Sequence, residues 1–66
     1  MIATINGTER EFAQPPTIAE LLDELGLTQG GVAVARNARV ITRSALADER
    51  LADGDIVEII GAVAGG

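Results

Sequence analysis

The stretch TIAELLDELGL, residues 17–27, predicts a single amphipathic helix, and the segments before and after it predict strands. Thr17 and Glu20 form a T-x-x-E capping box, in which each side chain accepts a hydrogen bond from a free backbone N–H of the first turn. Isoleucine and leucine recur at i, i+3, i+4 and i+7, so they form one apolar stripe. Gly26 supplies the left-handed residue that ends a helix, and Leu27 can then fold back onto the last turn.

The residues before this helix predict a β-hairpin. Met1 to Ile5 alternates at the period of a strand. Asn6-Gly7 follows, and this pair is typical of a two-residue hairpin turn because both turn positions need a positive φ. Residues 8–12 predict the second strand, and Phe12, the only aromatic residue of the chain, is expected in the core. Pro15-Pro16 ends the hairpin, since a proline cannot donate a ladder hydrogen bond.

The residues after the helix predict three more strands. Val32 to Ala35 alternates small and branched residues, Asn37-Ala38 is interpreted as a tight turn, and residues 39–41 return as a short strand. Residues 44–51 fit either a helical turn or an irregular crossover, and the sequence does not decide between them. Asp53-Gly54-Asp55 predicts a turn that leads into the last strand.

That last strand, residues 56–60, divides its side chains between two faces. Val57 and Ile59 share the face that is expected to contact the core, because side chains alternate along a strand. Ile56 and Ile60 lie on the opposite face. There they either form an exposed apolar docking patch for partner enzymes or are shielded by the neighbouring crossover, and both interpretations stay open.

The order strand-strand-helix-strand-strand-strand in so few residues predicts an α+β fold of the ubiquitin-like β-grasp type. We expect a mixed sheet of four or five strands, with the first and last strands parallel at its centre. One main helix, from about residue 17 to residue 25, should cross one face. Residues 1–61 would form this domain. Residues 62–66 carry no polar side chain and no capping or turn signal, so we expect a flexible C-terminal tail that ends in Gly65-Gly66.

Composition argues against an autonomous enzyme. The 66 residues make one small domain with a thin core, so an enclosed cavity of enzyme size is not expected. The chain contains no cysteine, no histidine and no lysine. Their absence removes thiolate nucleophiles, the commonest general base and metal ligand, and Schiff-base chemistry. We therefore expect no metal site and no bound cofactor.

Charge and hydropathy narrow the class of partner. Ten acidic residues against five arginines give a net charge of −5, which would repel a nucleic-acid backbone and favour basic partner surfaces. No signal peptide is visible at the start of the sequence. The longest nearly apolar stretch, residues 59–66, is far shorter than the ~20 residues that span a bilayer. We expect a cytoplasmic protein with no membrane association.

Two groups of polar side chains admit both a functional and a structural interpretation. Asp53 and Asp55 could be paired carboxylates or a metal site, but a D-G-D sequence before a strand is more often only a turn. Arg36, Arg39 and Arg43 could contact an acidic partner or a phosphate, but arginines in an acidic chain are more often solvated surface. We therefore expect a turn and solvated arginines at these positions.

Six stretches occur in a fixed order along the chain: the Asn6-Gly7 ending of the first strand, TIAELL at 17–22, VAVARN at 32–37, VITRS at 40–44, LADGDIVEI at 51–59 and the ending AVAGG at 62–66. Taken in this order, they make the chain resemble the thiamine-biosynthesis sulfur carriers of the ThiS family. The likeness covers essentially the whole chain. Two residues depart from it. The family often has a tryptophan near the position of Leu46 and a third glycine at the position of Ala64. The departure at Leu46 bears on partner contacts of the crossover and does not affect the chemistry.

The resemblance implies that the C-terminal glycine carries the chemistry. In the family, the carboxyl group that corresponds to Gly66 is joined to AMP from ATP, becomes a thiocarboxylate and donates sulfur for thiazole formation. The implied partners are an E1-like adenylyltransferase of the ThiF type, which uses the ATP, a thiazole synthase of the ThiG type and a sulfur donor such as a cysteine desulfurase. Gly65, Ala64 and Val63 would be recognised as the tail, because glycine lacks a Cβ and fits a narrow channel.

Three other functions are compatible with parts of this pattern. The VAGG ending also occurs in the sulfur carrier of molybdopterin synthesis, although that family is usually longer and often has prolines before its ending. A ubiquitin-like protein modifier would be activated at the same Gly-Gly end, but without lysine it could not form chains on its own side chains. A plain β-grasp binding module would not need a free Gly-Gly end.

Overall fold

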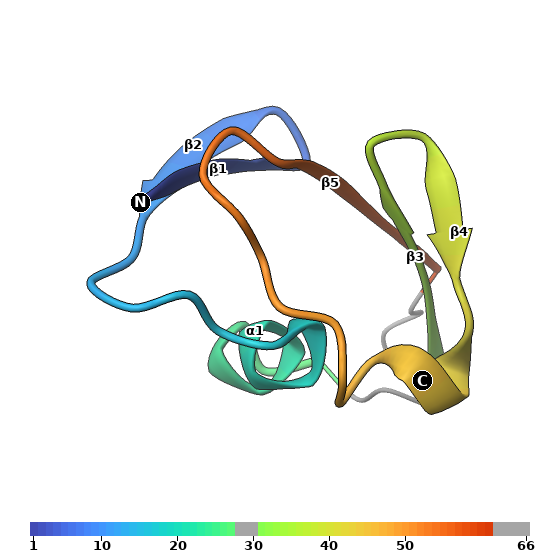
Figure 1. The fold of residues 1–66 in the computed structure, drawn as a ribbon. Coiled ribbons are helices and arrows are strands. Elements are labelled where there is room, and N and C mark those ends of the chain that lie inside the picture. The colour runs from blue at the N-terminus through green and yellow to red at the C-terminus, as the bar shows by residue number, and fades with distance from the viewer. Residues whose placement is uncertain (28–30, 62–66) are drawn as a thin grey trace.

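The computed structural model describes residues 1–27 and 31–61, which form one sheet covered on one face by a helix (Figure 1). The elements in chain order are β1 (Ile2–Ile5), β2 (Thr8–Glu11), α1 (Ile18–Glu24), β3 (Val32–Arg36), β4 (Arg39–Ile41), the 3-10 helix η2 (Arg43–Ala45) and β5 (Ile56–Gly61). The sheet has five strands in the order β2-β1-β5-β3-β4. This architecture confirms the predicted α+β fold of the β-grasp type.

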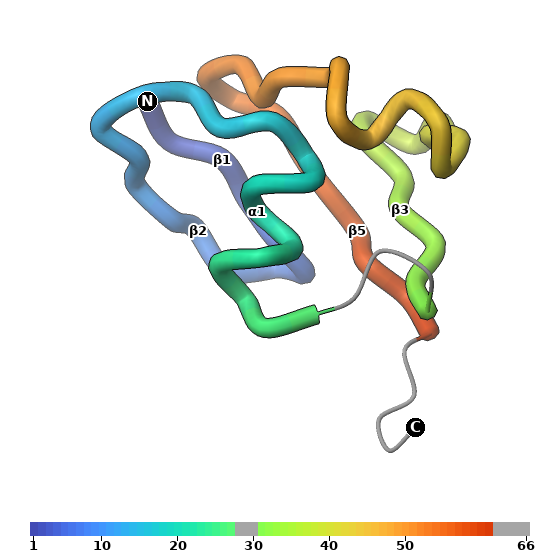
Figure 2. Tube along the Cα trace, turned by 90° about the horizontal axis from the view of Figure 1, so that it is seen from below, coloured from blue at the N-terminus to red at the C-terminus, as the bar shows by residue number. Residues whose placement is uncertain are grey.

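The centre of the sheet is the pair β1 and β5, which run parallel to each other with Ile5 opposite Val57. The other three neighbouring pairs are antiparallel. Figure 2 shows β1, β5 and β3 side by side, with α1 in front of the β1 side of the sheet. The predicted parallel pairing of the first and last strands is therefore confirmed, and the strand that leads to the C-terminus is held by a neighbour on each side.

Both hairpins turn through residues with positive φ. Asn6 and Gly7 have φ values of 50° and 83°, and Asn37 and Ala38 have values of 52° and 69°. This left-handed pair is what a two-residue hairpin needs to match the twist of its strands. Both predicted turns are confirmed, and Ala38 carries the higher cost because alanine, unlike glycine and asparagine, seldom adopts this conformation.

The helix has the caps that its sequence predicts. The Thr17 Oγ1 accepts from the Glu20 N–H at 3.1 Å, and the Glu20 carboxylate accepts from the Thr17 N–H at 2.9 Å. At the other end Gly26 has a φ of 78°, and the Leu27 N–H donates to the Leu22 carbonyl at 2.9 Å. The bond from Leu27 belongs to a Schellman motif, so the end of this seven-residue helix is satisfied by its own neighbours.

The core lies between α1 and the sheet and is closed at one side by the crossover, residues 42–55. Its buried side chains are Ile18, Leu21 and Leu22 from the helix, Ala3, Ile5, Val34 and Val57 from the sheet, and Leu46 and Leu51 from the crossover. Phe12 packs against this cluster while staying partly exposed. Leu46 is only 2% exposed, so this position is a core residue and not a partner contact.

The ambiguous stretch 44–51 combines the two alternatives: a short 3-10 helix followed by an irregular crossover. Its carbonyl groups complete the start of α1, because the Ile18 N–H donates to the Glu49 carbonyl and the Ala19 N–H to the Leu46 carbonyl. Among the described residues, no helix is long and apolar enough to cross a membrane. The predicted tail, residues 62–66, lies outside the described residues, so its flexibility and the domain boundary after residue 61 stay predictions.

Candidate functional site

The residues to which the sequence assigns the chemistry, Val63 to Gly66, lie outside the described residues. The structure instead gives the geometry of the base from which they extend. Gly61 is the last residue of β5, and it lies opposite Val32 of β3. Its φ is +103°, and a Cβ built on it would lie 3.1 Å from the carbonyl oxygen of Gly31. Only glycine fits this position without strain.

Two turn asparagines hold β5 from opposite sides. Asn6 donates its backbone N–H to the Val57 carbonyl at 2.9 Å, and its side chain bonds both the N–H and the C=O of Ile59. On the other side, the Asn37 N–H donates to the Ile56 carbonyl at 2.7 Å, and its Oδ1 accepts from the Ile56 N–H at 2.9 Å. The sequence identified both residues only as turn formers.

The outer face of the sheet, opposite the helix, carries the two isoleucines that were predicted there. Ile56 and Ile60 are 55% and 64% exposed. Ala33 lies opposite Ile60 across β3 and β5, and Val40 on β4 is 75% exposed. We call these four residues the outer apolar face. The crossover runs on the same side of the sheet as α1 (Figure 1), so the alternative that it shields the two isoleucines is wrong.

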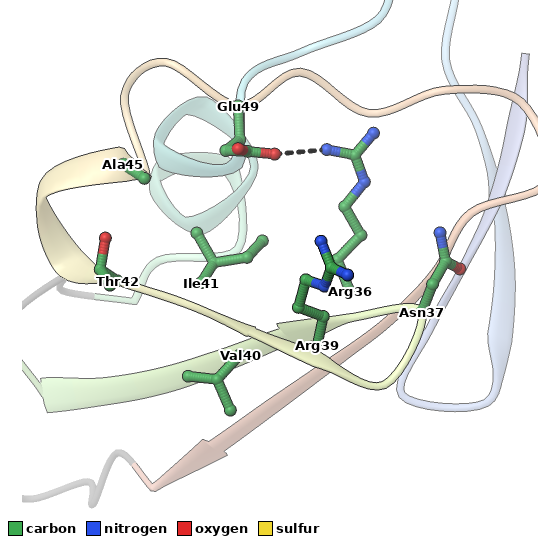
Figure 3. A pocket seen from close by; sticks show the side chains of 8 residues that line it. All are labelled: Arg36, Asn37, Arg39, Val40, Ile41, Thr42, Ala45 and Glu49. Atoms are coloured by element: carbon green, nitrogen blue, oxygen red, sulfur yellow. Dashed lines mark hydrogen bonds and ion pairs between the residues drawn. The ribbon is translucent and has the colours of Figure 1, made fainter.

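The arginines on β3 and β4 border an open hollow beside η2 (Figure 3). Arg36 is not a solvated arginine, because its guanidinium pairs with Glu49 at 2.6 Å and with Asp55 at 2.9 Å. That expectation was wrong for Arg36, since the sequence cannot show that β3 and the start of β5 bring opposite charges together. Arg39 is exposed at the edge of the hollow. The Arg36 charge is already balanced, so the hollow is a weak candidate for an anion site.

The aspartates of the D-G-D turn both serve the fold. Asp53 accepts from the Ile2 N–H at 2.7 Å. Asp55 is buried and accepts from the Ala52 N–H at 2.7 Å and from the Asn37 side chain at 3.1 Å. Burial raises the pKa of Asp55, but these hydrogen bonds and the Arg36 guanidinium outweigh it and hold that pKa below its ordinary value. Among residues 1–27 and 31–61 there is no cluster of three or more metal-ligating side chains.

The sequence of the chain matches the model of the ThiS family over residues 3–66. A thiazole synthase of Paramagnetospirillum magneticum is 41% identical over 66 residues, which are 100% of this chain but 20% of that protein. The sulfur carrier protein ThiS of Thermus thermophilus is 36% identical over 62 residues, which are 94% of this chain and 95% of that one.

Solved structures agree with the sequence comparisons. The crystal structure of the thiamine biosynthesis protein ThiS from Geobacter metallireducens superposes with a TM-score of 0.83 at 33% identity, covering 100% of both chains. A solution structure of a thiamine biosynthesis protein from the same organism gives a TM-score of 0.78 at 33% identity, with 100% of this chain and 88% of that chain covered.

Proposed function

The chain belongs to the ThiS family, a family of sulfur carriers for thiamine biosynthesis, and from this membership we propose that the carboxyl group of Gly66 carries the sulfur. The observation that supports this proposal most directly is the reach of the family match. It runs to residue 66 and so includes Gly65-Gly66. The Thermus thermophilus carrier, which is similar in length, supports the same assignment.

The proposed chemistry begins with activation of a poor electrophile. The Gly66 carboxylate attacks the α-phosphate of ATP on an E1-like adenylyltransferase, which forms an acyl adenylate and releases pyrophosphate. Sulfur delivered at the oxidation level of sulfide then attacks the acyl carbon. The carbon–oxygen bond to AMP breaks, AMP leaves with the electron pair, and Gly66 is left as a thiocarboxylate.

The residues of this chain fit the role of a carrier better than that of a catalyst. The chain has no cysteine, so its own side chains offer no sulfur atom for a persulfide, and the carboxyl carbon is the position that can hold the cargo. Gly65 and Gly66 lack a Cβ, so the backbone can enter a narrow channel and adopt the φ that the channel requires. Ala64 and Val63 would add a small apolar contact along the same channel.

We propose that the outer apolar face binds the activating enzyme. Ile56 and Ile60 project from β5, the strand whose continuation carries Gly66. Removing exposed branched side chains of this kind from water is favourable, so a partner that covers them gains binding free energy. Docking through this face would place a partner at the base of the tail, which is where an enzyme that acts on the chain end must bind.

The proposed sulfur acceptor is a thiazole synthase. In the Paramagnetospirillum magneticum relative, the region that matches this chain makes up 20% of a thiazole synthase polypeptide. A sequence like this one is thus covalently joined to the synthase in that organism. Such a joined arrangement supports a functional partnership between this chain and a synthase of the ThiG type.

The test is intact-mass spectrometry after incubation with the adenylyltransferase, ATP and a sulfur donor. The unmodified chain should gain the mass of sulfur minus oxygen, located on Gly66. Deleting Gly66, or adding one glycine after it, shifts the reacting carbon by up to ~3.6 Å. A misplacement of 1 Å can cost about a hundredfold in rate, so both variants should fail to load.

Far-ultraviolet circular dichroism of both variants serves as the control, since their fold should be unchanged. Loading of the extended variant at the rate of the unmodified chain would contradict the assignment to the terminal carboxyl. The adenylyltransferase must first be shown to act on the carrier protein that is its known substrate. If that enzyme never adenylates this chain, the sulfur-carrier function itself is contradicted.

A further inference from the structure

We propose that Asn6 and Gly61 are positioning residues that fix where, and in which direction, the C-terminal residues leave the sheet. This inference rests on the proposed function, because it concerns how Gly66 is presented to the activating enzyme. It is carried by two independent features of the structure: the side-chain bonds of Asn6 to β5, and the backbone conformation of Gly61.

The side chain of Asn6 takes the place of a missing strand residue. The ladder between β1 and β5 ends where Ile5 lies opposite Val57, because the chain then turns away at Gly7. The next backbone groups of β5 on that side belong to Ile59. Its N–H donates to the Asn6 Oδ1 at 2.7 Å, and its C=O accepts from the Asn6 Nδ2 at 3.3 Å. The primary amide thus repeats the donor and acceptor pattern of a backbone peptide group.

This pairing requires an amide and not merely a residue that tolerates a positive φ. Glycine at position 6 would suit the φ of 50° but would leave the Ile59 groups unpaired on that side. Aspartate would keep an acceptor for the Ile59 N–H. It would also turn a carboxylate oxygen toward the Ile59 carbonyl, where asparagine has a donor. The structure therefore gives Asn6 a role that turn formation does not explain.

Gly61 sets the direction of departure. Its φ of +103° lies in a region that L-residues with a side chain rarely adopt, and it ends the pairing of β5 with Val32. An added Cβ would meet the carbonyl oxygen of Gly31, a backbone atom, at 3.1 Å. An alanine here would have to change φ or push β3 away. Either adjustment would alter the course of the chain at the point where residue 62 begins.

The exit matters because the remaining chain is short. Five residues follow Gly61, and fully extended they reach at most about 18 Å. Ile56 and Ile60 of the outer apolar face lie on β5 itself. The end of β5 would therefore set the point from which Gly66 reaches a docked partner. A shift or rotation of that end would displace the reacting carbon even though docking is intact.

Asn37 provides a matched control, because it makes a similar clamp at the opposite end of the same strand. It too has a left-handed φ, 52°, and it bonds the N–H and C=O of Ile56. Asn37→Gly should loosen β5 at its start, four residues before Ile60, and should leave the exit unchanged. The Asn37 side chain also donates to Asp55 at 3.1 Å, so a role of Asn6 in stability alone would make Asn37→Gly at least as harmful as Asn6→Gly.

The first experiment compares Asn6→Gly, Asn6→Asp and Asn37→Gly. Hydrogen exchange should accelerate at least tenfold at the Ile59 amide in both Asn6 variants and should change little there in Asn37→Gly. Pyrophosphate release by the adenylyltransferase should show kcat at least tenfold lower for the Asn6 variants, with KM within about twofold. Asn37→Gly should keep its kcat within about twofold. Equal losses of kcat in Asn6→Gly and Asn37→Gly would overturn the proposal for Asn6.

The second experiment uses total synthesis of the 66-residue chain to place alanine of either hand at position 61. L-alanine should lower kcat at least tenfold. D-alanine, which favours positive φ, should restore kcat to within about threefold of the unmodified chain. Full activity with L-alanine would overturn the role of Gly61. If the unmodified chain is never adenylated, the proposed function fails as well, whereas normal adenylation of every variant overturns this inference alone.

Discussion

The carboxylate of Asp55 lies buried where β5 begins, with its side chain 8% exposed. Groups from three parts of the chain satisfy it: the Ala52 N–H of the crossover, the Asn37 amide of the second hairpin turn and the Arg36 guanidinium of β3. A buried charge is costly unless it is paired and hydrogen-bonded. This network therefore joins the start of the last strand to its neighbours.

We predict that Asp55→Asn lowers the free energy of unfolding by roughly 2–3 kcal/mol near pH 7, because it leaves Arg36 and Asn37 donors facing an amide. The pKa of Asp55 is lowered in the folded state. Its stabilising contribution is thus present above the ordinary aspartate pKa of about 3.9 and is lost as the pH falls through the folded value.

Urea unfolding of both proteins between pH 2 and pH 7 measures this effect. The difference between the unmodified chain and Asp55→Asn should shrink as the pH falls below about 4. Asp53→Asn makes the same change of charge in the same turn at an exposed side chain, and it is the control. A constant difference over the whole range would show that Asp55 does not stabilise the fold through its charge.

At this scale the sequence predicts contacts between near neighbours and misses distant ones. Thr17 and Glu20 are three residues apart, so their reciprocal caps follow from helix geometry alone. Arg36 and Asp55 are 19 residues apart, and only the pairing of β3 with β5 brings them together. No local signal distinguishes Arg36 from a solvated arginine, and none shows that Asn6 bonds to Ile59.

Among the elements, β5 joins the proposed docking face to the proposed carrier end. We predict that Ile60→Ser raises the KM of the adenylyltransferase for this chain by about tenfold or more, with little change of kcat. The physical reason is that covering an exposed branched side chain in an interface contributes on the order of 1.5 kcal/mol or more. The same side chain is 64% exposed in the free protein, so its loss should change stability little.

Ile2→Ser is the matched control for that experiment. Ile2 is also an exposed isoleucine, at 44%, and it too faces away from the core, because its neighbour Ala3 is buried. It lies on β1 opposite Glu11 of the edge strand β2, outside the four residues of the outer apolar face. Steady-state pyrophosphate release for both variants separates the two outcomes. A KM for Ile60→Ser that stays at the value of the unmodified chain would mean that the outer apolar face does not dock the enzyme.

The helix and the first hairpin were predictable as elements because each is specified by its own residues. The crossover was not, since residues 44–51 have neither helical nor strand periodicity. Its course is set by burial of Leu46 and Leu51 in the core and by the hydrogen bonds that its carbonyl groups accept from the start of α1. Those contacts exist only after the helix and sheet have packed together.

At the scale of the whole molecule, the proposed function makes the folded domain the part that binds the enzyme and the short chain end the part that reacts. The helix and the crossover cover one face of the sheet, and the other face is open. The central strand β5 is the last strand before the chain end that carries Gly66. The site residues stay a prediction, and the geometry of their base could not be predicted from the sequence. Gly66 follows from the family resemblance, whereas the fixed exit at Gly61 depends on a backbone angle and on the nearby carbonyl of Gly31.

This arrangement predicts that the tail alone is a poor substrate. A synthetic peptide of residues 60–66, IGAVAGG, contains the reacting carboxyl group but neither the folded domain nor the positioned exit. Binding energy from parts of a substrate remote from the reacting group is used to position that group. Holding the reacting groups in place can itself be worth several orders of magnitude in rate. The peptide should therefore be adenylated with a kcat/KM about a thousandfold or more below that of the whole chain.

Pyrophosphate release with the peptide and with the whole chain, at equal enzyme concentration, measures that ratio. Adding the domain of residues 1–61 in trans should not restore the rate, because it would occupy the docking site without delivering a carboxyl group. It should instead inhibit loading of the whole chain, with an inhibition constant close to the KM of the chain. A peptide that is adenylated within tenfold of the whole chain would show that the enzyme recognises only the tail, and the outer apolar face would then have no part in activation.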